Sequence, residues 1–359
     1  MASVMELYGI VNPGIEQLAS AEVEELCKAK VDVSPSVISF KIKDQEFCHY
    51  LSHAQAPRRI LAALGRAENI ETFSFTDVDW KNLFPEGRSF KIEVENVKGQ
   101  DNRFRIAKQV GGKLFPLLEK NHINGKLELK RPDFLVVVFY NGEEYFVGIQ
   151  HTVEEHNSRG YRIFPHSGSF KGDFAYFFVR KAGFNKDGKL LVGFLKDGVM
   201  AIEAALFASG KQVTDVSSLS YLPFYQGPKD GARKDEVKES FVIAAFDHSI
   251  QNVTASRKNA KLAAVHEEID VQKLSLEDLD VRFGEDSFDS AIFHVTSKDE
   301  DSINEIYYQA SYVLKSGGRL LLIAREQAGF SISDKFELKE EGLLQKGDSI
   351  HKYWLLEKR

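Results

Sequence analysis

The chain has 359 residues, 43% hydrophobic and 28% charged, which is typical of a folded globular protein of two or three domains. Only Cys27 and Cys48 are present, which excludes a disulfide scaffold and a cysteine-based zinc site, and the scattered histidines predict no metal site. The net charge of −6 argues against a protein that coats nucleic acid through bulk charge, and no membrane span or signal peptide is predicted, so we expect a cytoplasmic protein.

The first 75 residues predict a small unit of strands and helices. Residues 6–11 alternate as a strand that stops at a Pro-Gly turn, and apolar positions from Ile15 onward fall on one helical face. Residues 33–43 alternate as another strand, residues 47–64 predict a helix, and residues 72–84 predict one more.

Residues 89–152 predict a strand, a long helix and three further strands. The strand covers 89–97 and the helix 100–119, while the three strands lie within 126–152 and the last two join at an Asn-Gly hairpin turn. The pair Gly111-Gly112 lies inside the helix, where each glycine costs about 1 kcal/mol relative to alanine. It therefore indicates either close packing or a break.

Charge is distributed unevenly along this half. Residues 1–87 carry 8 Lys/Arg against 13 Asp/Glu, whereas residues 88–131 carry 11 against 5. A basic segment in an acidic protein is expected where one surface meets phosphates, and a solvated helix face would explain it equally well.

The order of these elements resembles a THUMP domain preceded by a ferredoxin-like segment. The resemblance rests on Pro13-Gly14-Ile15-Glu16, the basic helix, Lys130-Arg131-Pro132-Asp133 and the final hairpin with its Gly-Ile-Gln. It implies binding of structured RNA, classically tRNA through its acceptor end. The basic residues that we expect at such an interface are Arg103, Arg105, Lys108, Lys113, Lys130, Arg131, Arg159 and Arg162.

The last two of these arginines lie in a segment with linker composition, residues 153–172. Arg159-Gly160-Tyr161-Arg162 is similar to the R-G-Y-R stretch of THUMP methyltransferases, while of the H-P-A-P-L-K stretch only His166 and Lys171 are kept. Arginine and aromatic side chains in a linker can contact RNA or can hold two domains together. Both interpretations stay open from the sequence.

Residues 173–359 alternate strands and helices as a Rossmann-like doubly wound sheet closed by an antiparallel pair. The predicted division is a ferredoxin-like domain at 1–75, a THUMP domain at 76–152, a linker at 153–172 and a methyltransferase-like domain at 173–359. The overall fold class is thus α/β with α+β. Residues 211–240 are rich in Gly, Pro and charge and predict a long loop or insertion.

This second half resembles class I methyltransferases that use S-adenosylmethionine (SAM) to modify guanine N2 in RNA. Their first motif reads D-P-x-C-G-S-G-T ahead of E-A-A, and here Glu203 to Ala205 keep the second part. Val192 stands where the motif has Asp, Lys196 replaces its first Gly, and Gly198 retains its second. A lysine where backbone must approach a ligand closely is a steric problem.

The remaining motif positions are partly kept. Asp247 matches the acid that binds the ribose, Ser275 matches the third polar position, and the catalytic N-P-P-Y becomes His294-Val295-Thr296-Ser297. That motif positions an exocyclic amine and a flipped base. His294 can bond an amine in principle, and a histidine at a strand end is more often structural.

Three hypotheses follow. The first is an RNA-binding protein, for tRNA above all, built like a SAM-dependent methyltransferase in which methyl transfer and SAM binding are weak or lost; it acts alone or with a partner protein subunit. The second is an active tRNA or rRNA methyltransferase with a diverged site in which Asp247 still holds the ribose. The third is a binder of nucleotides or metabolites that reuses the cleft. Positioning is most of the catalysis in methyl transfer to a base amine, so replacing N-P-P-Y favours the first hypothesis.

Overall fold

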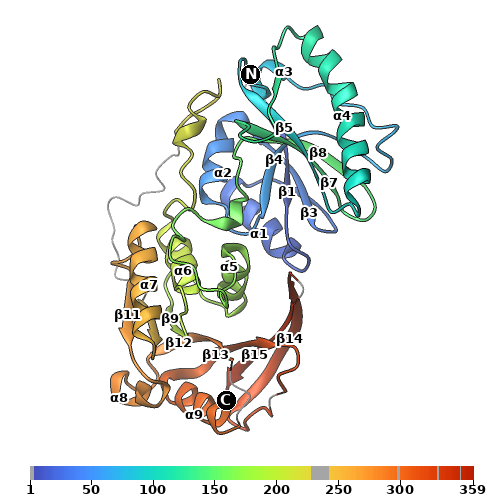
Figure 1. The fold of residues 1–359 in the computed structure, drawn as a ribbon. Coiled ribbons are helices and arrows are strands. Elements are labelled where there is room, and N and C mark those ends of the chain that lie inside the picture. Colours follow the sequence, from blue (N-terminus) through green and yellow to red (C-terminus); the bar gives the residue numbers. More distant parts are fainter. Residues whose placement is uncertain (1–3, 228–241, 297–299, 330, 348) are drawn as a thin grey trace. The chain divides into compact units, whose positions relative to one another are not determined.

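A computed structural model describes residues 4–227, 242–296, 300–329, 331–347 and 349–359. The chain forms two compact units. Unit 1 comprises residues 1–157 together with 214–229, and unit 2 comprises residues 158–213 together with 230–359. Figure 1 shows both units coloured along the sequence. Within the described ranges, no helix combines the length and apolarity that crossing a membrane requires.

Unit 1 is built on one eight-stranded sheet with the order β2-β3-β1-β4-β8-β7-β5-β6. Its strands are β1 (Val4–Ile10), β2 (Val31–Ser34), β3 (Val37–Lys43), β4 (Arg59–Ala67), β5 (Ser89–Glu95), β6 (Lys126–Leu127), β7 (Phe134–Tyr140) and β8 (Tyr145–Gln150). Its α-helices are α1 (Glu16–Cys27), α2 (Phe47–His53), α3 (Trp80–Leu83) and α4 (Gln100–Lys120). The segments predicted as ferredoxin-like and THUMP domains therefore share one sheet, joined where β4 pairs with β8, and their division at residue 75 stays a prediction.

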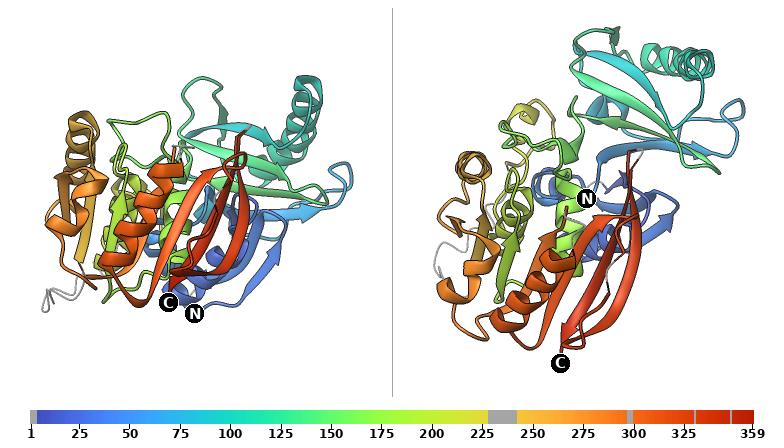
Figure 2. Two further views of the ribbon diagram at one scale, coloured as in Figure 1. Left: turned by 90° about the horizontal axis from the view of Figure 1, so that it is seen from below. Right: turned by 60° about the horizontal axis from the view of Figure 1, so that its bottom comes forward.

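The second half of unit 1 follows the sequence prediction closely. The long helix α4 packs against β5, and β7 and β8 form the predicted hairpin around Asn141-Gly142. Figure 2 shows α4 as the long teal helix of this unit. Gly111 does not break the helix: a Cβ placed there would lie 3.3 Å from Ile92 Cδ1 of β5. Close packing is therefore the reason for this glycine.

Three predictions in the first half are wrong. Residues 33–43 are two strands, because the chain turns at Pro35-Ser36 and Ser36 adopts φ 58°. The helix predicted for 47–64 ends at His53, and β4 follows after Pro57, which cannot continue a helix. Residues 72–84 contain only the four-residue helix α3. Strand β4 is buried along most of its length, so its apolar run carried no period that distinguishes a strand from a helix.

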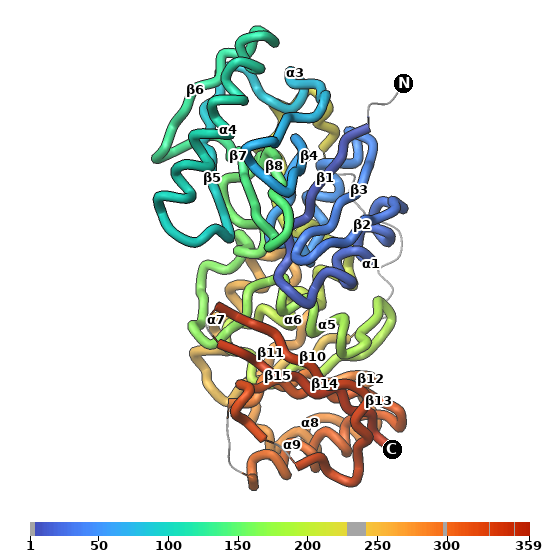
Figure 3. The backbone as a smooth tube through the Cα atoms, turned by 90° about the vertical axis from the view of Figure 1, so that its right-hand side faces the viewer, coloured from blue at the N-terminus to red at the C-terminus, as the bar shows by residue number. Residues whose placement is uncertain are grey.

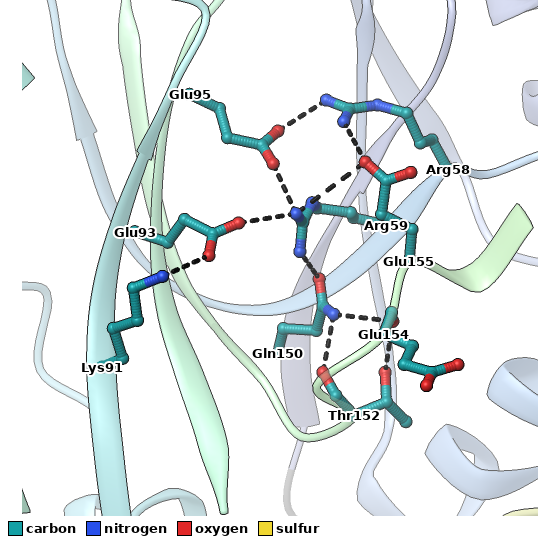
Figure 4. Close-up of polar contacts among 9 residues, drawn as sticks. All are labelled: Arg58, Arg59, Lys91, Glu93, Glu95, Gln150, Thr152, Glu154 and Glu155. Carbon is teal, nitrogen blue, oxygen red and sulfur yellow. Dashed lines mark hydrogen bonds and ion pairs between the residues drawn. The ribbon is translucent and has the colours of Figure 1, made fainter. Parts of the chain in front are cut away.

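A network of ion pairs and hydrogen bonds ties the start of β4 to β5 and β8 in unit 1 (Figure 4). Arg59 Nη2 lies 2.7 Å from Glu93 Oε1 and 2.5 Å from Glu95 Oε1, and its Nη1 donates to Gln150 Oε1 at 2.9 Å. Arg58 pairs with the other Glu95 oxygen at 2.6 Å. Because only 6% of the Arg59 side chain is exposed, these pairs compensate a charge that burial would otherwise penalise.

The predicted loop 211–240 is described as far as residue 227. Its residues 214–227 belong to unit 1. Thr214 N donates to Ser52 O at 3.2 Å, and the Phe224 ring lies 5.9 Å from that of Phe47. The Arg88 guanidinium stacks 3.8 Å from the centre of the Tyr221 ring. This segment is therefore packed on unit 1, while residues 228–240 of the predicted loop lie outside the described residues.

Unit 2 is a doubly wound sheet with the order β11-β10-β9-β12-β13-β15-β14, parallel except at β15 and β14. Its strands are β9 (Lys189–Gly193), β10 (Val242–Asp247), β11 (Ile269–Lys273), β12 (Phe288–His294), β13 (Leu314–Arg325), β14 (Phe336–Lys346) and β15 (Ser349–Lys358). Its α-helices are α5 (Gly172–Lys181), α6 (Val199–Ser209), α7 (Ile250–Leu262), α8 (Leu279–Arg282) and α9 (Glu300–Val313). Helices α5, α6 and α7 cover one face and α8 and α9 the other (Figures 1 and 3).

Candidate functional site at the carboxyl edge of the unit 2 sheet

The candidate site lies where the winding of the unit 2 sheet reverses. From β9 the chain proceeds outward to β10 and β11, and it then returns to β12 on the other side of β9. Ligands of open α/β sheets bind outside the carboxyl ends of the strands at such a switch point. The residues that directly follow β9 and end β12 therefore decide what this domain can bind.

The turn after β9 keeps the shape of a glycine-rich loop with few glycines. Phe194, Lys196 and Gly198 have φ values of 59°, 57° and 81°, all in the left-handed region. This region costs a residue with a side chain about 1 kcal/mol or more, so Phe194 and Lys196 hold their conformation against a local preference. The expected strand, turn and helix are present here, and Phe194 and Lys196 place large side chains at two positions of the turn.

The side chain of Lys196 points across the switch point. Its Nζ lies 2.6 Å from His294 Nδ1 at the end of β12 and 3.3 Å from the Gly168 carbonyl oxygen. Burial, followed by the charge of Lys346, lowers the pKa of Lys196 to about 7. The cavity lined by this lysine, Phe170, His294 and the β9 turn admits the centre of a water-sized sphere over only about 10 Å³, which is room for about one water molecule.

His294 helps to fill the space at the switch point. It is 7% exposed, its ring stacks on Phe170 with 4.7 Å between ring centres, and burial followed by the charge of Lys196 lowers its pKa well below the usual value. A neutral His294 can accept a hydrogen bond at Nδ1 from the Lys196 ammonium group. These contacts favour the structural interpretation of His294, and its catalytic role stays a prediction.

Asp247 ends β10 at the position predicted for the ribose-binding acid, but its carboxylate already has protein partners. Its Oδ2 accepts from Lys196 N at 3.2 Å and from Asn252 Nδ2 at 3.1 Å, and its Oδ1 accepts from Ser249 N at 2.8 Å. The residue is 2% exposed. Asp247 thus holds the β9 turn and the start of α7.

The other two predicted cofactor positions lie at the same edge. Gly198 begins α6, and a Cβ there would approach Ser256 Cβ to 2.8 Å, so close contact with α7 requires the glycine. Ser275 follows β11, is half-buried and precedes a short 3₁₀ turn. The structure therefore brings Gly198, Asp247 and Ser275 to one edge, and their roles toward a cofactor stay predictions.

The Arg159-Gly160-Tyr161-Arg162 motif is packed inside unit 2. Arg159 and Glu203 form a two-pronged pair, with Nε–Oε1 at 2.8 Å and Nη2–Oε2 at 3.0 Å, and neither side chain has exposed surface. Burial opposes the charge of Arg159, but Glu203 holds its pKa above the usual value. The Tyr161 hydroxyl donates to Glu203 at 2.6 Å. The expectation that Arg159 contacts RNA is therefore wrong for this structure, because its guanidinium is enclosed.

Arg162 is also paired with a buried carboxylate of unit 2. Its Nε donates to Asp197 Oδ2 at 2.8 Å, and 13% of its side chain is exposed, against none for Asp197. The side-chain amide of Asn259 in α7 donates to the Asp197 carbonyl at 3.0 Å. Asp197 thus gives Arg162 a buried counter-charge in the β9 turn, while Arg159 is held by Glu203 of α6.

The basic residues of unit 1 divide into two groups. Arg103, Arg105 and Lys108 on α4 are exposed, as are Lys130 and Arg131 beyond β6. Lys113 is different: its Nζ donates to the carbonyl oxygens of Ile70, Glu71 and Phe73 at 3.2, 2.7 and 2.7 Å. Lys113 therefore holds the 70–73 segment against α4, which its sequence position gave no means of predicting.

Exposed apolar side chains accompany these cations, a feature that the sequence analysis missed. Phe104 of α4 is 71% exposed, and Leu129, next to Lys130, is 67% exposed. Phe104 lies between Arg103 and Arg105, and Leu129 directly precedes Lys130 and Arg131, which is the only signal that the sequence offered. Aromatic side chains beside Arg and Lys are used to stack on unpaired bases.

Solved structures share the fold of the whole chain. TrmN from Thermus thermophilus superposes with a TM-score of 0.68, covering 99% of this chain and all of that chain, at 18% sequence identity. A possible methylase from Clostridium difficile 630 gives 0.78, covering 99% of both chains at 16% identity. The predicted fold class, with a C-terminal Rossmann-like doubly wound domain, is confirmed.

Sequence relatives point the same way. A tRNA (guanine(6)-N2)-methyltransferase of Methanocaldococcus jannaschii is 23% identical, over 94% of this chain and 96% of its own. One of Archaeoglobus fulgidus is 25% identical, over 61% of this chain and 57% of its own. Residues 159–331 match the family described as RMKL-like, methyltransferase domain. The predicted resemblance to class I SAM-dependent RNA methyltransferases is thereby confirmed.

Proposed function

We propose that this protein binds structured RNA, tRNA above all, and that its methyltransferase domain has weak or lost transfer activity. The relatives named as tRNA methyltransferases support RNA as the ligand class, and they cover nearly the whole chain in one case. The THUMP-like order of elements in unit 1 supports the same class. The replaced motifs of unit 2 support the loss of transfer.

The placement of Lys196 carries the proposal. A class I cofactor site needs room at the β9 turn for the methionine end of SAM, and here the lysine side chain crosses that room and bonds to His294. Asp247, which would accept hydrogen bonds from the ribose hydroxyls, is 2% exposed and already accepts hydrogen bonds from three protein donors. The residues present therefore do not fit SAM.

The exposed cations of unit 1 supply the RNA-binding part. Arg103 and Lys108 lie on α4 with the exposed ring of Phe104 beside Arg103. Cations attract the phosphates through a sequence-independent force, and an exposed aromatic ring adds stacking on an unpaired base. Such a surface fits a folded RNA with a single-stranded end.

The first experiment is calorimetric titration of the purified full chain with S-adenosylhomocysteine (SAH) and SAM. We expect no saturable binding of the wild type up to millimolar ligand. In Lys196→Gly we expect measurable SAH binding, because the change removes the side chain that occupies the space at the β9 turn. Glycine also suits the left-handed φ of 57° at this position. Micromolar binding by the wild type would contradict the proposal and favour an active methyltransferase in which Asp247 still holds the ribose.

The second experiment measures tRNA affinity by filter binding at two salt concentrations. Replacing both Arg103 and Lys108 by Ala should weaken binding about tenfold and lower the slope of log affinity against log salt by about 2, because two phosphate contacts are lost. Lys30→Ala with Lys43→Ala is the matched control: these lysines are also exposed in unit 1, but on its acidic segment. Equal losses in both double variants would reduce the effect to net charge and contradict an interface on α4.

A further inference from the structure

A hollow of about 430 Å³ lies on unit 1, and this volume is within the range of small-molecule sites in proteins. The start of β1, the end of β3 and the segment from residue 76 to α3 line it. Val4 pairs with Lys43 in the sheet, and Thr76 N donates to Leu64 O of β4 at 2.9 Å, so these three parts of the chain are held side by side. All the lining residues fall within the acidic segment 1–87, whose charge the proposed function leaves unexplained.

The charged side chains that line the hollow are mostly carboxylates. They are Glu6, Asp44, Asp77 and Asp79, together with Lys41. Lys41 Nζ lies 3.9 Å from Glu6 Oε2, and 68% and 41% of these two side chains are exposed. Such an exposed pair contributes little, and it leaves the three aspartates of the hollow without a cation.

The partners of these aspartates do not neutralise them. Asp79 accepts from Asn82 N at 3.3 Å and from Asn82 Nδ2 at 2.8 Å, and both donors are uncharged. Within the described ranges of the chain, neither Asp44 nor Asp77 has a side-chain hydrogen bond or an ion pair. The hollow therefore has an excess of negative charge, which attracts cations.

Asp44 is the residue that most needs a partner. It follows β3 directly, lines the hollow and is only 9% exposed. A carboxylate that is largely removed from water costs free energy unless a hydrogen bond or an opposite charge compensates it, so an unpartnered one indicates an unseen ligand. A cation inside the hollow supplies the partner that Asp44 lacks.

The arrangement of the lining residues indicates what kind of cation fits. Among the residues that the structure describes, no three or more Asp, Glu, His or Cys side chains are grouped closely enough to hold a metal ion. The carboxylates are therefore too widely spaced to share one small ion, and a ligand with separated positive groups matches them better. Met5, Ala63 and Leu83 also line the hollow and offer apolar surface between the charges.

We propose that this hollow, here called the Asp44 hollow, binds an aliphatic amine with two or more ammonium groups, that is, a diamine or a polyamine. The enclosed Asp44 receives one ammonium group, and the exposed Asp77 and Asp79 receive the others. The methylene groups between them contact the apolar lining. This inference goes beyond the proposed function and does not depend on RNA binding by α4.

The test is calorimetric titration of the RNA-free full chain with spermidine at constant ionic strength. We expect saturable binding at one site, with a dissociation constant of millimolar or below. Asp44→Asn should weaken binding by at least about tenfold, because a hydrogen bond between charged groups is lost, and Asp77→Asn should weaken it less. Glu24→Gln is the matched control: Glu24 is an exposed acid of the same segment that does not line the hollow. Urea midpoints close to that of the wild type establish that the variants fold.

Two further ligands separate a built site from attraction by bulk charge. Butylamine has the carbon chain of putrescine with a single ammonium group, so it should bind at least tenfold more weakly than putrescine. Magnesium chloride at the same ionic strength should not displace spermidine. Absence of saturable spermidine binding, displacement by magnesium, an unchanged affinity in Asp44→Asn or an equal loss in Glu24→Gln would each overturn the proposal. SAH binding and tRNA affinity test the proposed function separately.

Discussion

The buried pair of Arg159 and Glu203 gives the sharpest stability prediction. In Glu203→Gln the side chain keeps its size, but the carboxylate that compensates Arg159 is lost, and both side chains have no exposed surface. The variant also leaves one of three hydrogen bonds from Arg159 and Tyr161 without its original acceptor. Removing one partner of a buried pair costs about 3–5 kcal/mol, and Asp173 is the remaining nearby carboxylate.

The assay is urea unfolding followed by tryptophan fluorescence. The chain has two tryptophans, Trp80 in unit 1 and Trp354 in unit 2, so Trp80→Phe leaves a probe of unit 2 alone. With a urea dependence of about 2 kcal/mol per molar, Glu203→Gln should lower the midpoint by about 1.5–2.5 M. In the Trp354→Phe background, which reports on unit 1, the same variant provides the reference measurement.

A double variant checks the cause. Arg159→Met with Glu203→Leu removes both charges and fills the space with apolar atoms, so it should recover most of the lost stability. A loss below about 1 kcal/mol in Glu203→Gln, or a double variant as unstable as the single one, would refute the electrostatic reasoning. If Arg159→Met instead lowered tRNA affinity without changing the midpoint, the enclosed position of Arg159 in this structure would be wrong.

Three other outcomes are expected. Burial lowers the pKa of His151 to about 3, so the unfolded chain gains a proton below pH 6.5 that the folded chain does not. The stability of unit 1 should therefore fall from pH 6.5 toward pH 3. Urea melts at pH 6.5 and at pH 5 should show a loss that is about 2 kcal/mol smaller in His151→Phe than in the wild type. Gly198→Ala should lower stability by about 2–4 kcal/mol, because its Cβ would lie 2.8 Å from Ser256; Gly317→Ala, with φ 73° and open space, should cost only about 1 kcal/mol in the same assay. Arg59→Met should lower the stability of unit 1 by about 3 kcal/mol in urea, because two glutamates lose their main partner; an unchanged midpoint would show that the network in Figure 4 is not stabilising.

Several parts of this protein follow from local sequence patterns. The period of apolar residues located α4, the Asn-Gly turn located the β7–β8 hairpin, and the alternation of strands and helices from residue 173 gave the doubly wound sheet. The order of motifs also placed Asp247 at a strand end and Lys196 in the turn after β9. These features follow from hydrogen bonds and side-chain periods within short segments, which is why they can be read from one chain.

The contacts of these residues depend on segments that are distant in the sequence. Residues 59–67 form a central strand because both of its neighbours supply pairing edges, although their apolar run is compatible with a helix. Arg159 meets Glu203, Lys113 meets the carbonyls of 70–73, and Lys346 reaches Ser169 across 177 positions of sequence. The energy of a cation depends on whether its surroundings are water, a carboxylate or another cation. Those surroundings are assembled from distant segments, so an exposed RNA contact and a buried structural arginine look alike in the sequence.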